Sequence, residues 1–522
     1  MTKTNYPALV GTFVITVGLL GGGAWSLSKM APGLLGNGNS ANNQSAIAPQ
    51  NATQLTLLGD TFSGYSTFRN EAFQTVLADT GLTLAYGDEF DQAARAAALG
   101  TGAADIIVTT LDQYLQQQPE GTIVGMIDRT IGADAVVLNT PKYASLTSLL
   151  ELAPLLQQAQ SQGQSLKIAF AGDTPSEYLA LVLDTKFDAF NLSEFEIVRV
   201  ADASEAWALM QDPNENVAIA VLWEPFIAQA RQQGYTVVLS SNDAPNSIVD
   251  VIVASERLMQ SRPEVIATLL ENYYRRIDTN VRDASQLQTQ IASDGALSPA
   301  DAGTVLQGID FFTAAEAQTW MTDGTLQRRI EAIAAVLVLS GRINDLPSNP
   351  ETLFTDEYLR EAAQNTQTLI DLVRADNPEL AERLAGSTEQ TLNIPTVTAE
   401  EVQAAPDIGN LDVQGKVEFG TGSAQLTAAG QQTLQGLVTE IQEFNPESVA
   451  VRVIVHSSRT VAADLNQQLS QQRAQVEVDF LRNQGIQHNI VAEGKGFNLP
   501  LSGVDPADPA QQRTEIRLVR VN

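Results

Sequence analysis

Short apolar runs alternate with segments of helical periodicity from residue 55 to residue 254. Each run is four to six residues long and rich in Val, Ile and Leu, which is typical of buried strands. Strands that alternate with helices predict an α/β architecture, and the chain from Glu264 to about Ala385 is predicted to be helical. The predicted strands are Leu55–Leu58, Asp105–Val108, Ala135–Leu138, Lys167–Phe170, Glu196–Val200, Val217–Leu222, Thr236–Leu239 and Val249–Ala254.

The length and composition of the chain limit its class. At 522 residues, of which 44% are hydrophobic, it is long enough for two or three domains. A net charge of −31 argues against a nucleic-acid partner, because phosphates are bound by basic surfaces. The chain has no cysteine and two histidines, and it carries no HExxH, Walker or dinucleotide-binding motif. We therefore expect a protein that is not an enzyme and that binds no metal and no cofactor.

Residues 7–25 form an apolar segment without charge, between Lys3 and Lys29. As a helix these nineteen residues span about 28 Å, close to the hydrocarbon thickness of a bilayer. The residues that follow make a poor signal-peptidase site, so we favour an uncleaved transmembrane helix within residues 1–30 over a cleaved signal peptide. Residues 31–54 are rich in Gly, Asn, Ser and Ala, which predicts a flexible linker.

A predicted helix near the C-terminus carries a polar and an apolar stripe. At 3.6 residues per turn, the polar stripe contains Asn466, Ser470, Arg473 and Glu477. The apolar stripe contains Leu465, Leu469, Val476 and Phe480. We expect the apolar face to pack against the domain and the polar face to bind a ligand.

The spacing Asn466-x-x-Leu469-Ser470-x-x-Arg473-Ala474 resembles the signature of the OmpA-like domain, which binds peptidoglycan noncovalently. The resemblance extends from Val417 through Gly494 to Leu518. It implies a small α+β domain over residues 411–522, preceded by a linker at residues 386–410, and a place in the cell envelope.

The same resemblance implies a binding site. In the family, an aspartate at a strand end and an arginine on the following helix bind the ammonium and carboxylate groups of diaminopimelate. Arg473 stands at the arginine position, where its planar fork suits a carboxylate, but Ser458 stands at the aspartate position. Asp464 is an alternative source of the missing charge, and the alternative role for Arg473 is an exposed ion pair with Glu477. The predicted peptidoglycan-binding residues are Ser458, Asn466, Arg473 and Arg513.

Three segments resemble, in order and spacing, the substrate-binding proteins of ABC importers of the nitrate, sulfonate and taurine branch. They are Gly59–Ser66, Ile131–Val137 and Val221–Phe226. This resemblance implies a two-lobed type II periplasmic-binding-protein fold over residues 55–385. It also implies a periplasmic location, a small-molecule solute and an ABC permease as a partner.

In that fold the solute lies between the lobes at strand C-termini and helix N-termini, where free backbone N–H groups favour anions. The alternative role of hydroxyl residues at such positions is to cap helices, and that of Glu224 is to accept from a neighbouring backbone amide. Asp60, if it points into the cleft, disfavours a small inorganic anion unless it is protonated or paired. The predicted solute-binding residues are Thr61, Ser63, Gly64, Tyr65, Ser66, Thr174, Ser176 and Glu224.

These predictions describe an envelope protein on the periplasmic side, tethered to a membrane by its N-terminal helix. It binds a small anionic solute between two lobes and docks on peptidoglycan. The alternative is a structural link between membrane and cell wall in which the solute cleft is degenerate. A third hypothesis, an enzyme that uses Glu224 and Asp60 as an acid/base pair, has the weakest support.

Overall fold

The computed structural model describes residues 53–386, 394–460 and 462–521. The predicted anchor at residues 1–30 lies outside the described residues, as does the predicted linker up to residue 52. Within the described part of the chain, no helix combines the length and the apolar character that crossing a bilayer requires.

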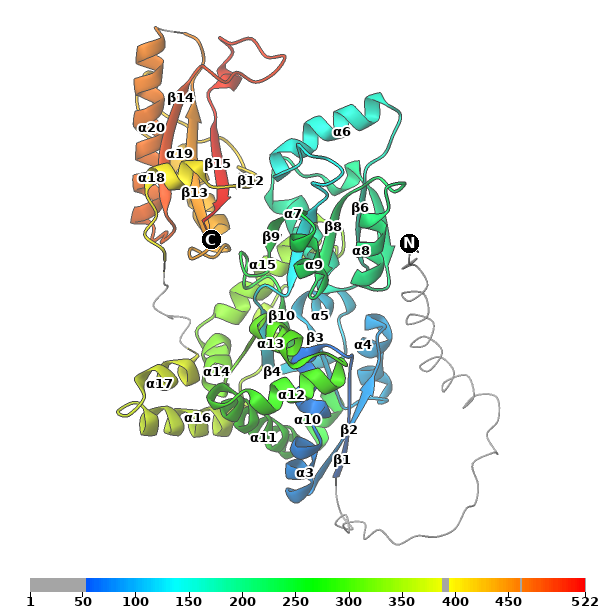
Figure 1. Cartoon of the computed structure of the whole chain (residues 1–522). Helices are drawn as coiled ribbons and strands as arrows, with labels where there is room; N and C mark the ends of the chain where they lie inside the picture. The colour runs from blue at the N-terminus through cyan, green and yellow to red at the C-terminus, as the bar shows by residue number, and fades with distance from the viewer. Residues whose placement is uncertain (1–52, 387–393, 461, 522) are drawn as a thin grey trace, which may run out of the picture. The chain divides into compact units, whose positions relative to one another are not determined.

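The first α/β lobe is built on a sheet of order β11-β4-β10-β3-β1-β2 (Figure 1). Strand β1 pairs in parallel with β2 and β3, whereas β10 runs antiparallel to β3 and β4. All residues of β3 and β10 are buried, as expected for strands that are covered on both faces. The strands are β1 Thr53–Gly59, β2 Leu82–Asp88, β3 Ile106–Thr110, β4 Gly121–Thr130, β10 Val249–Ser255 and β11 Ile309–Phe311.

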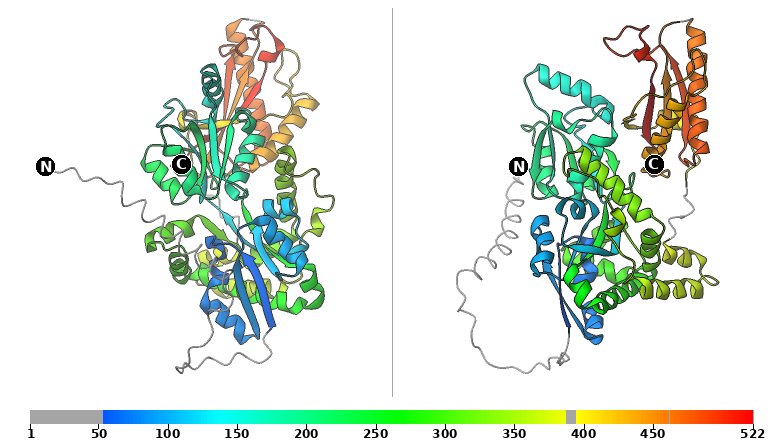
Figure 2. Two further views of the ribbon diagram at one scale, coloured as in Figure 1. Left: turned by 90° about the vertical axis from the view of Figure 1, so that its right-hand side faces the viewer. Right: turned by 180° about the vertical axis from the view of Figure 1, so that it is seen from behind.

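The second α/β lobe contains a sheet of order β7-β6-β8-β5-β9. The chain enters this lobe after β4 and returns to the first lobe at β10, so two crossings connect the lobes. Figure 2 shows helices on both sides of each sheet. The strands are β5 Asp134–Leu138, β6 Lys167–Ala171, β7 Glu196–Val200, β8 Val217–Trp223 and β9 Thr236–Ser240.

The helices of the two lobes begin at residues suited to helix starts. Asn70, Asp91 and Thr174 each cap a helix by accepting from a backbone N–H, and Pro263 occupies the first turn of α11. The helices are α2 Ser66–Arg69, α3 Glu71–Asp79, α4 Gln92–Thr101, α5 Leu111–Gln117, α6 Leu152–Ser161, α7 Pro175–Lys186, α8 Ala203–Gln211, α9 Phe226–Gln232, α10 Glu256–Ser261, α11 Pro263–Arg282, α12 Ser285–Asp294, α13 Pro299–Gln307, α14 Ala314–Thr322, α15 Thr325–Leu339, α16 Arg360–Val373 and α17 Pro378–Ala385.

All eight predicted strands are present, with ends within two residues of the prediction. The prediction missed β2 and β4, and it was wrong in treating the chain after Glu264 as wholly helical, because β11 pairs with β4. Strand β4 escaped notice because Asp128 and Arg129 interrupt its apolar run. Both are buried, and Arg129 forms an ion pair with Asp310 and lies 3.0 Å from Glu316.

The C-terminal domain contains a sheet of order β12-β15-β13-β14. Strand β15 runs antiparallel to β12 and β13, and β14 pairs in parallel with β13. Helix α18 and most of β12 fall within residues 386–410, which the sequence predicted as linker, so the sheet begins before residue 411. The elements are α18 Ala399–Ala404, β12 Asp407–Leu411, α19 Ala428–Gln442, β13 Val449–His456, α20 Ala463–Asn483, β14 Ile490–Gly496 and β15 Thr514–Arg520.

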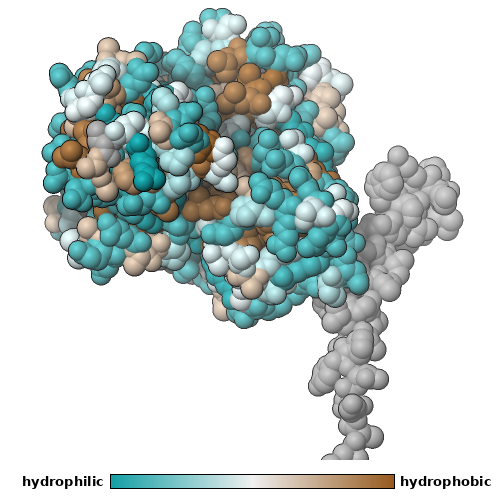
Figure 3. Space-filling model, turned by 90° about the horizontal axis from the view of Figure 1, so that it is seen from above, coloured by the Kyte–Doolittle hydropathy of each residue, from teal (hydrophilic) through white to brown (hydrophobic). Residues whose placement is uncertain are grey.

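The face of the molecule in Figure 3 is mostly hydrophilic, with apolar residues in several separate groups. Exposed large apolar side chains come from distant parts of the sequence, among them Phe90, Leu339, Leu372 and Leu499. Such scattered exposure is ordinary for a protein surface and marks no single patch.

Helix α20 packs on the sheet through its polar stripe, so the predicted assignment of its two faces was wrong. Asn466, Ser470, Arg473 and Glu477 are buried, whereas Leu465 is 57% exposed. Glu477 binds Thr514 and Arg473 binds Ser423, whereas Ser470 faces β14, which forms one edge of the sheet and leaves backbone groups without a neighbouring strand. Polar side chains of α20 bind those groups instead.

Three side chains of α20 make these hydrogen bonds. Gln471 Oε1 accepts from the Gly494 N–H at 2.8 Å, and its Nε2 donates to the Ala492 carbonyl at 3.1 Å. Ser470 Oγ accepts from the Gly496 N–H at 2.9 Å, and Gln467 Nε2 donates to the Gly494 carbonyl. Helix and strand come so close that a Cβ added at Gly494 would lie 2.5 Å from Gln471 Cα.

We predict that Gly494→Ala destabilises the C-terminal domain by about 1 to 3 kcal/mol, because the added methyl group meets helix backbone that cannot move aside cheaply. Gly436→Ala is the control, because a Cβ at that position in α19 has nothing within 4 Å. Thermal unfolding of both variants beside the wild type measures the effect. Equal stability of the Gly494 variant and the wild type would contradict the prediction.

Candidate functional site

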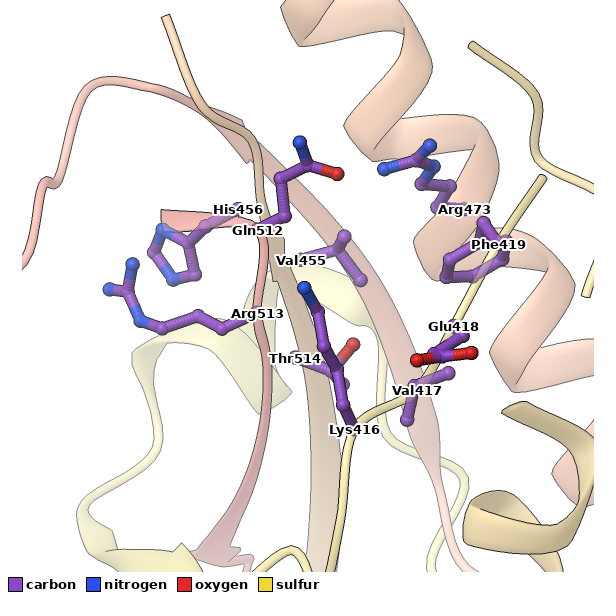
Figure 4. A pocket seen from close by; sticks show the side chains of 10 residues that line it. All are labelled: Lys416, Val417, Glu418, Phe419, Val455, His456, Arg473, Gln512, Arg513 and Thr514. Atoms are coloured by element: carbon purple, nitrogen blue, oxygen red, sulfur yellow. The ribbon is translucent and has the colours of Figure 1, made fainter. Parts of the chain in front are cut away.

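A cavity of about 260 Å³ lies between helix α20 and the segment before α19 (Figure 4). The C-terminal end of β13 and the N-terminal end of β15 also line it. Arg473 and Arg513, two of the predicted peptidoglycan-binding residues, line it, whereas Ser458 and Asn466 are not among its lining residues. The lining residues are Lys416, Val417, Glu418, Phe419, Val455, His456, Arg473, Gln512, Arg513 and Thr514.

Arg473 projects from α20 into this cavity (Figure 4). Its Nε donates to the Ser423 carbonyl at 2.9 Å, and its guanidinium carbon lies 4.9 Å from the centre of the Phe419 ring. The residue is only 6% exposed, so the alternative of an exposed surface arginine is wrong. Burial lowers the pKa of Arg473, an effect that the nearby Glu477 opposes. One edge of the guanidinium is thus fixed, and the remaining N–H groups are available to a ligand.

Glu477 lies one turn further along α20 and is fully buried. Its Oε1 accepts from the Thr514 hydroxyl at 2.8 Å. Burial raises the pKa of Glu477 to about 8, although the Thr514 hydrogen bond and the charge of Arg473 lower it. Near neutral pH the carboxyl group is therefore largely protonated and leaves the positive charge of Arg473 uncompensated.

Arg513 is compensated within the protein. Its Nε donates to Glu515 Oε1 at 2.9 Å, and His456 Nε2 lies 3.1 Å from the same oxygen. Burial of Glu515 opposes ionisation, but the His456 hydrogen bond and the charges of Arg513 and Arg517 hold its pKa at about 2. Lys416 differs from Arg513 because its Nζ donates to a neutral group, the Pro509 carbonyl at 3.5 Å, and this bond leaves its charge uncompensated. Arg473 and Lys416 are therefore the cations that the cavity offers.

Ser458 follows β13 but does not replace the charge of the family aspartate. It is 2% exposed, and its hydroxyl accepts from Gln512 Nε2 at 3.0 Å. Asp464, the predicted alternative, is exposed in the first turn of α20 and is not among the lining residues of the cavity. A neutral hydrogen bond thus stands where a negative charge was expected.

The predicted solute loop after β1 is folded onto its own lobe. Ser63, Gly64 and Tyr65 form a short 3-10 helix, and α2 starts at Ser66. The Tyr65 hydroxyl donates to Asp250, and Ser66 Oγ donates to Asp294 Oδ2 at 2.8 Å. Gly64, Tyr65 and Ser66 are buried.

The other parts of this loop remain more accessible. Thr61 is exposed and Ser63 is half-buried. Asp60 forms an ion pair with Arg95 at 2.8 Å. Because this cation balances its charge, Asp60 does not disfavour an anionic solute. Beneath the loop, Asp128 is fully buried, and burial raises its pKa well above the ordinary carboxyl value, as does the neighbouring Asp250.

In the second lobe, Thr174 and Glu224 make the hydrogen bonds that their alternative roles predict, which are helix capping for Thr174 and acceptance from a backbone amide for Glu224. Thr174 caps α7 by accepting from the Ser176 N–H at 3.2 Å, and Ser176 donates to Asp134 at 3.1 Å. Burial raises the pKa of Asp134 to about 7, and the Ser176 hydrogen bond lowers it in part. Glu224 accepts from the Ala228 N–H at 3.1 Å, and it also lines a depression with Arg231 and other residues.

Comparison with known proteins identifies the C-terminal domain. Residues 418–514 match the sequence model described as the OmpA family, which confirms the predicted OmpA-like domain. Outer membrane protein A of Shimwellia blattae is 35% identical over 105 residues, 20% of this chain and 43% of that protein. The probable lipoprotein YiaD of Escherichia coli is 32% identical over 109 residues, 21% of this chain and 49% of that protein. The chain thus spans less than half the length of these relatives.

Solved structures similar to the chain include periplasmic binding proteins. The aliphatic sulphonate binding protein SsuA from Escherichia coli has 13% identity and a TM-score of 0.44, covering 58% of this chain and 98% of SsuA. The nitrate-binding protein NrtA from Synechocystis has 12% identity and a TM-score of 0.45, covering 66% of this chain and all of NrtA. The desulfurization enzyme DSZB has 12% identity and a TM-score of 0.41, covering 60% of this chain and 99% of DSZB.

We predict that Glu477→Gln makes the C-terminal domain less sensitive to alkaline pH. The unfolded chain releases this proton near the ordinary carboxyl pKa of 4.5, whereas the folded domain holds it up to about 8. Folding therefore takes up a proton between these values, and wild-type stability falls as the pH rises through this window. The variant should gain little at pH 4 and on the order of 5 kcal/mol at pH 9, because glutamine stays neutral.

Calorimetric unfolding of the wild type and the variant at these two pH values gives the comparison. The Glu418→Gln variant is the control, since that carboxylate is exposed. A difference between the Glu477 variant and the wild type that stays constant with pH would count against a protonated Glu477.

Proposed function

We propose that the protein is a noncatalytic cell-envelope protein whose C-terminal domain docks on peptidoglycan through the cavity at Arg473. The observation that carries this proposal is the state of Arg473. It is buried, held by Ser423 and Phe419, and flanked by a carboxyl group that burial keeps protonated. An arginine held in this way is prepared to bind a carboxylate.

We propose that this ligand is the carboxylate of a peptidoglycan stem peptide. A charge-assisted hydrogen bond of this kind contributes about 1.5 to 3 kcal/mol. Part of the entropy cost is already met, because the protein fixes the guanidinium plane before the ligand arrives. The match of residues 418–514 to the OmpA family supports the same ligand.

The apolar segment at residues 7–25 supports a membrane anchor. Such an anchor would hold the two-lobed body on the periplasmic side of the membrane, near the cell wall. An ABC permease is the partner that the resemblance to importer proteins favours. A wall-docked receptor would act beside one fixed membrane region, because the tether and the docked domain together limit its movement.

For the two lobes we propose solute binding as a second function. The observation that favours it is the depression at the ends of β5, β8 and β9, which is also lined by first-lobe residues such as Thr304 and by Ser448 and Arg520 of the C-terminal domain. The two crossings between the lobes, residues 131–133 and 241–248, are the places where a hinge would act. The internal hydrogen bonds of Tyr65 and Ser66 instead favour the alternative, a structural link with a degenerate cleft.

We expect Arg473→Ala to reduce binding to purified peptidoglycan sacculi by about ten- to hundredfold, because the ligand carboxylate loses its charged partner. Cosedimentation of the protein with sacculi measures the bound fraction. Arg482→Ala is the matched control, since Arg482 belongs to the same helix but is not a lining residue of the cavity. If the wild type does not sediment with sacculi, or if both variants bind equally well, docking through this cavity is refuted.

A panel of sulfonates, nitrate and amino acids in a thermal-shift assay tests the second function. A true solute at one hundred times its dissociation constant should stabilise the folded protein by about 2.7 kcal/mol. The gain should shrink in Glu224→Gln, because that side chain lines the depression. A panel without any shift would favour the structural link.

A further inference from the structure

Glu418 is held in place by its own backbone. Its carbonyl accepts from the Thr427 N–H at 3.0 Å and from the Thr427 hydroxyl at 3.3 Å. Its peptide nitrogen is so close to α19 that a Cβ added at Gly430 would lie 2.8 Å away. The adjacent Val417 is buried at 7% exposure and fixes the direction of the chain. The Glu418 side chain therefore starts from a fixed point at the cavity.

Glu418 lines the same cavity as Arg473, and its side chain lies beside those of Lys416 and Val417 (Figure 4). Among the described residues, no lysine or arginine lies within 4.0 Å of the Glu418 carboxylate. Lys416 also lines the cavity, two residues away. The cavity thus presents uncompensated charges of both signs, with Glu418 as its negative group.

A cavity with separated positive and negative groups fits a ligand that carries both charges itself. A ligand with a carboxylate alone would bind Arg473 but would be repelled by Glu418. A ligand with an ammonium group beside the carboxylate would satisfy both side chains, and each would stay hydrated until the ligand arrived. The free amino-acid end of a peptidoglycan stem peptide carries this pair of charges.

We infer that Glu418 is the specificity-determining residue that binds the ligand's ammonium group, in place of the charge that Ser458 does not supply. The inference rests on the proposed peptidoglycan docking and names the chemical class of its ligand, a zwitterionic amino-acid terminus. Ser458 is already bound to Gln512, and Asp464 is exposed outside the cavity lining. Glu418 is the acid that reaches the site from a different part of the fold.

The test compares native sacculi with sacculi whose free amines have been acetylated with acetic anhydride. The full chain in detergent should bind native sacculi about tenfold or more tightly than acetylated ones. Glu418→Gln should weaken binding to native sacculi by about tenfold and bring the ratio between the two preparations to about one. Glu418→Asp should retain part of the preference, because it keeps the charge on a shorter side chain.

Two further variants separate the possible outcomes. Asp464→Asn is the matched control and should behave as the wild type, so a loss of the preference in that variant would assign the role to Asp464 and overturn the inference. Arg473→Ala should lose binding to both preparations. If it does, while Glu418→Gln keeps the wild-type ratio, the inference is overturned and the docking proposal stands. If the wild type binds neither preparation, the docking proposal fails and the inference fails with it.

Discussion

The free edge of β14 is the constraint on which the C-terminal domain depends. No strand of the described domain covers this edge, and its backbone groups are satisfied by Gln467, Ser470 and Gln471 of α20. Because these side chains bind the strand backbone directly, helix and strand must approach closely, and Gly494 makes the approach possible. The position of α20 along the strand then determines the depth at which Arg473 enters the cavity. The same contact stabilises the fold and places the binding group.

The cations next to each buried carboxyl group around the cavity decide whether that group is ionised. Glu515 is surrounded by His456, Arg513 and Arg517 and remains ionised, so it neutralises the cations that face it. Glu477 has only one cation nearby and a hydroxyl partner, and burial keeps it protonated. Similar residue types thus play opposite parts within one small domain. The difference leaves the charge of Arg473 without an ionised partner on α20.

The sequence predicted the eight strands from their short apolar runs, which are continuous where a strand such as β3 or β10 is buried on both faces. It could not predict β4, because its buried Arg129 is paired with Asp310 and Glu316 from distant parts of the chain, and its Asp128 is buried without a hydrogen-bond partner among the described residues. Arg473 could be found from its spacing on a helix, but the buried side of that helix could not, since it depends on the edge that α20 covers. Lys416 and Glu418 lie more than fifty residues before Arg473, and only the fold brings them to the same cavity.

The order of the strands has a consequence for how the two lobes are completed as the chain is made. Strands β3 and β4 follow each other in sequence, yet β10 lies between them in the sheet of the first lobe. That sheet therefore lacks the strand between β3 and β4 until the chain has been synthesised as far as Ser255, where β10 ends. The sheet of the second lobe ends with β9 at Ser240 and needs no later strand. The lobe that begins first along the chain is thus the later of the two to have its full set of strands.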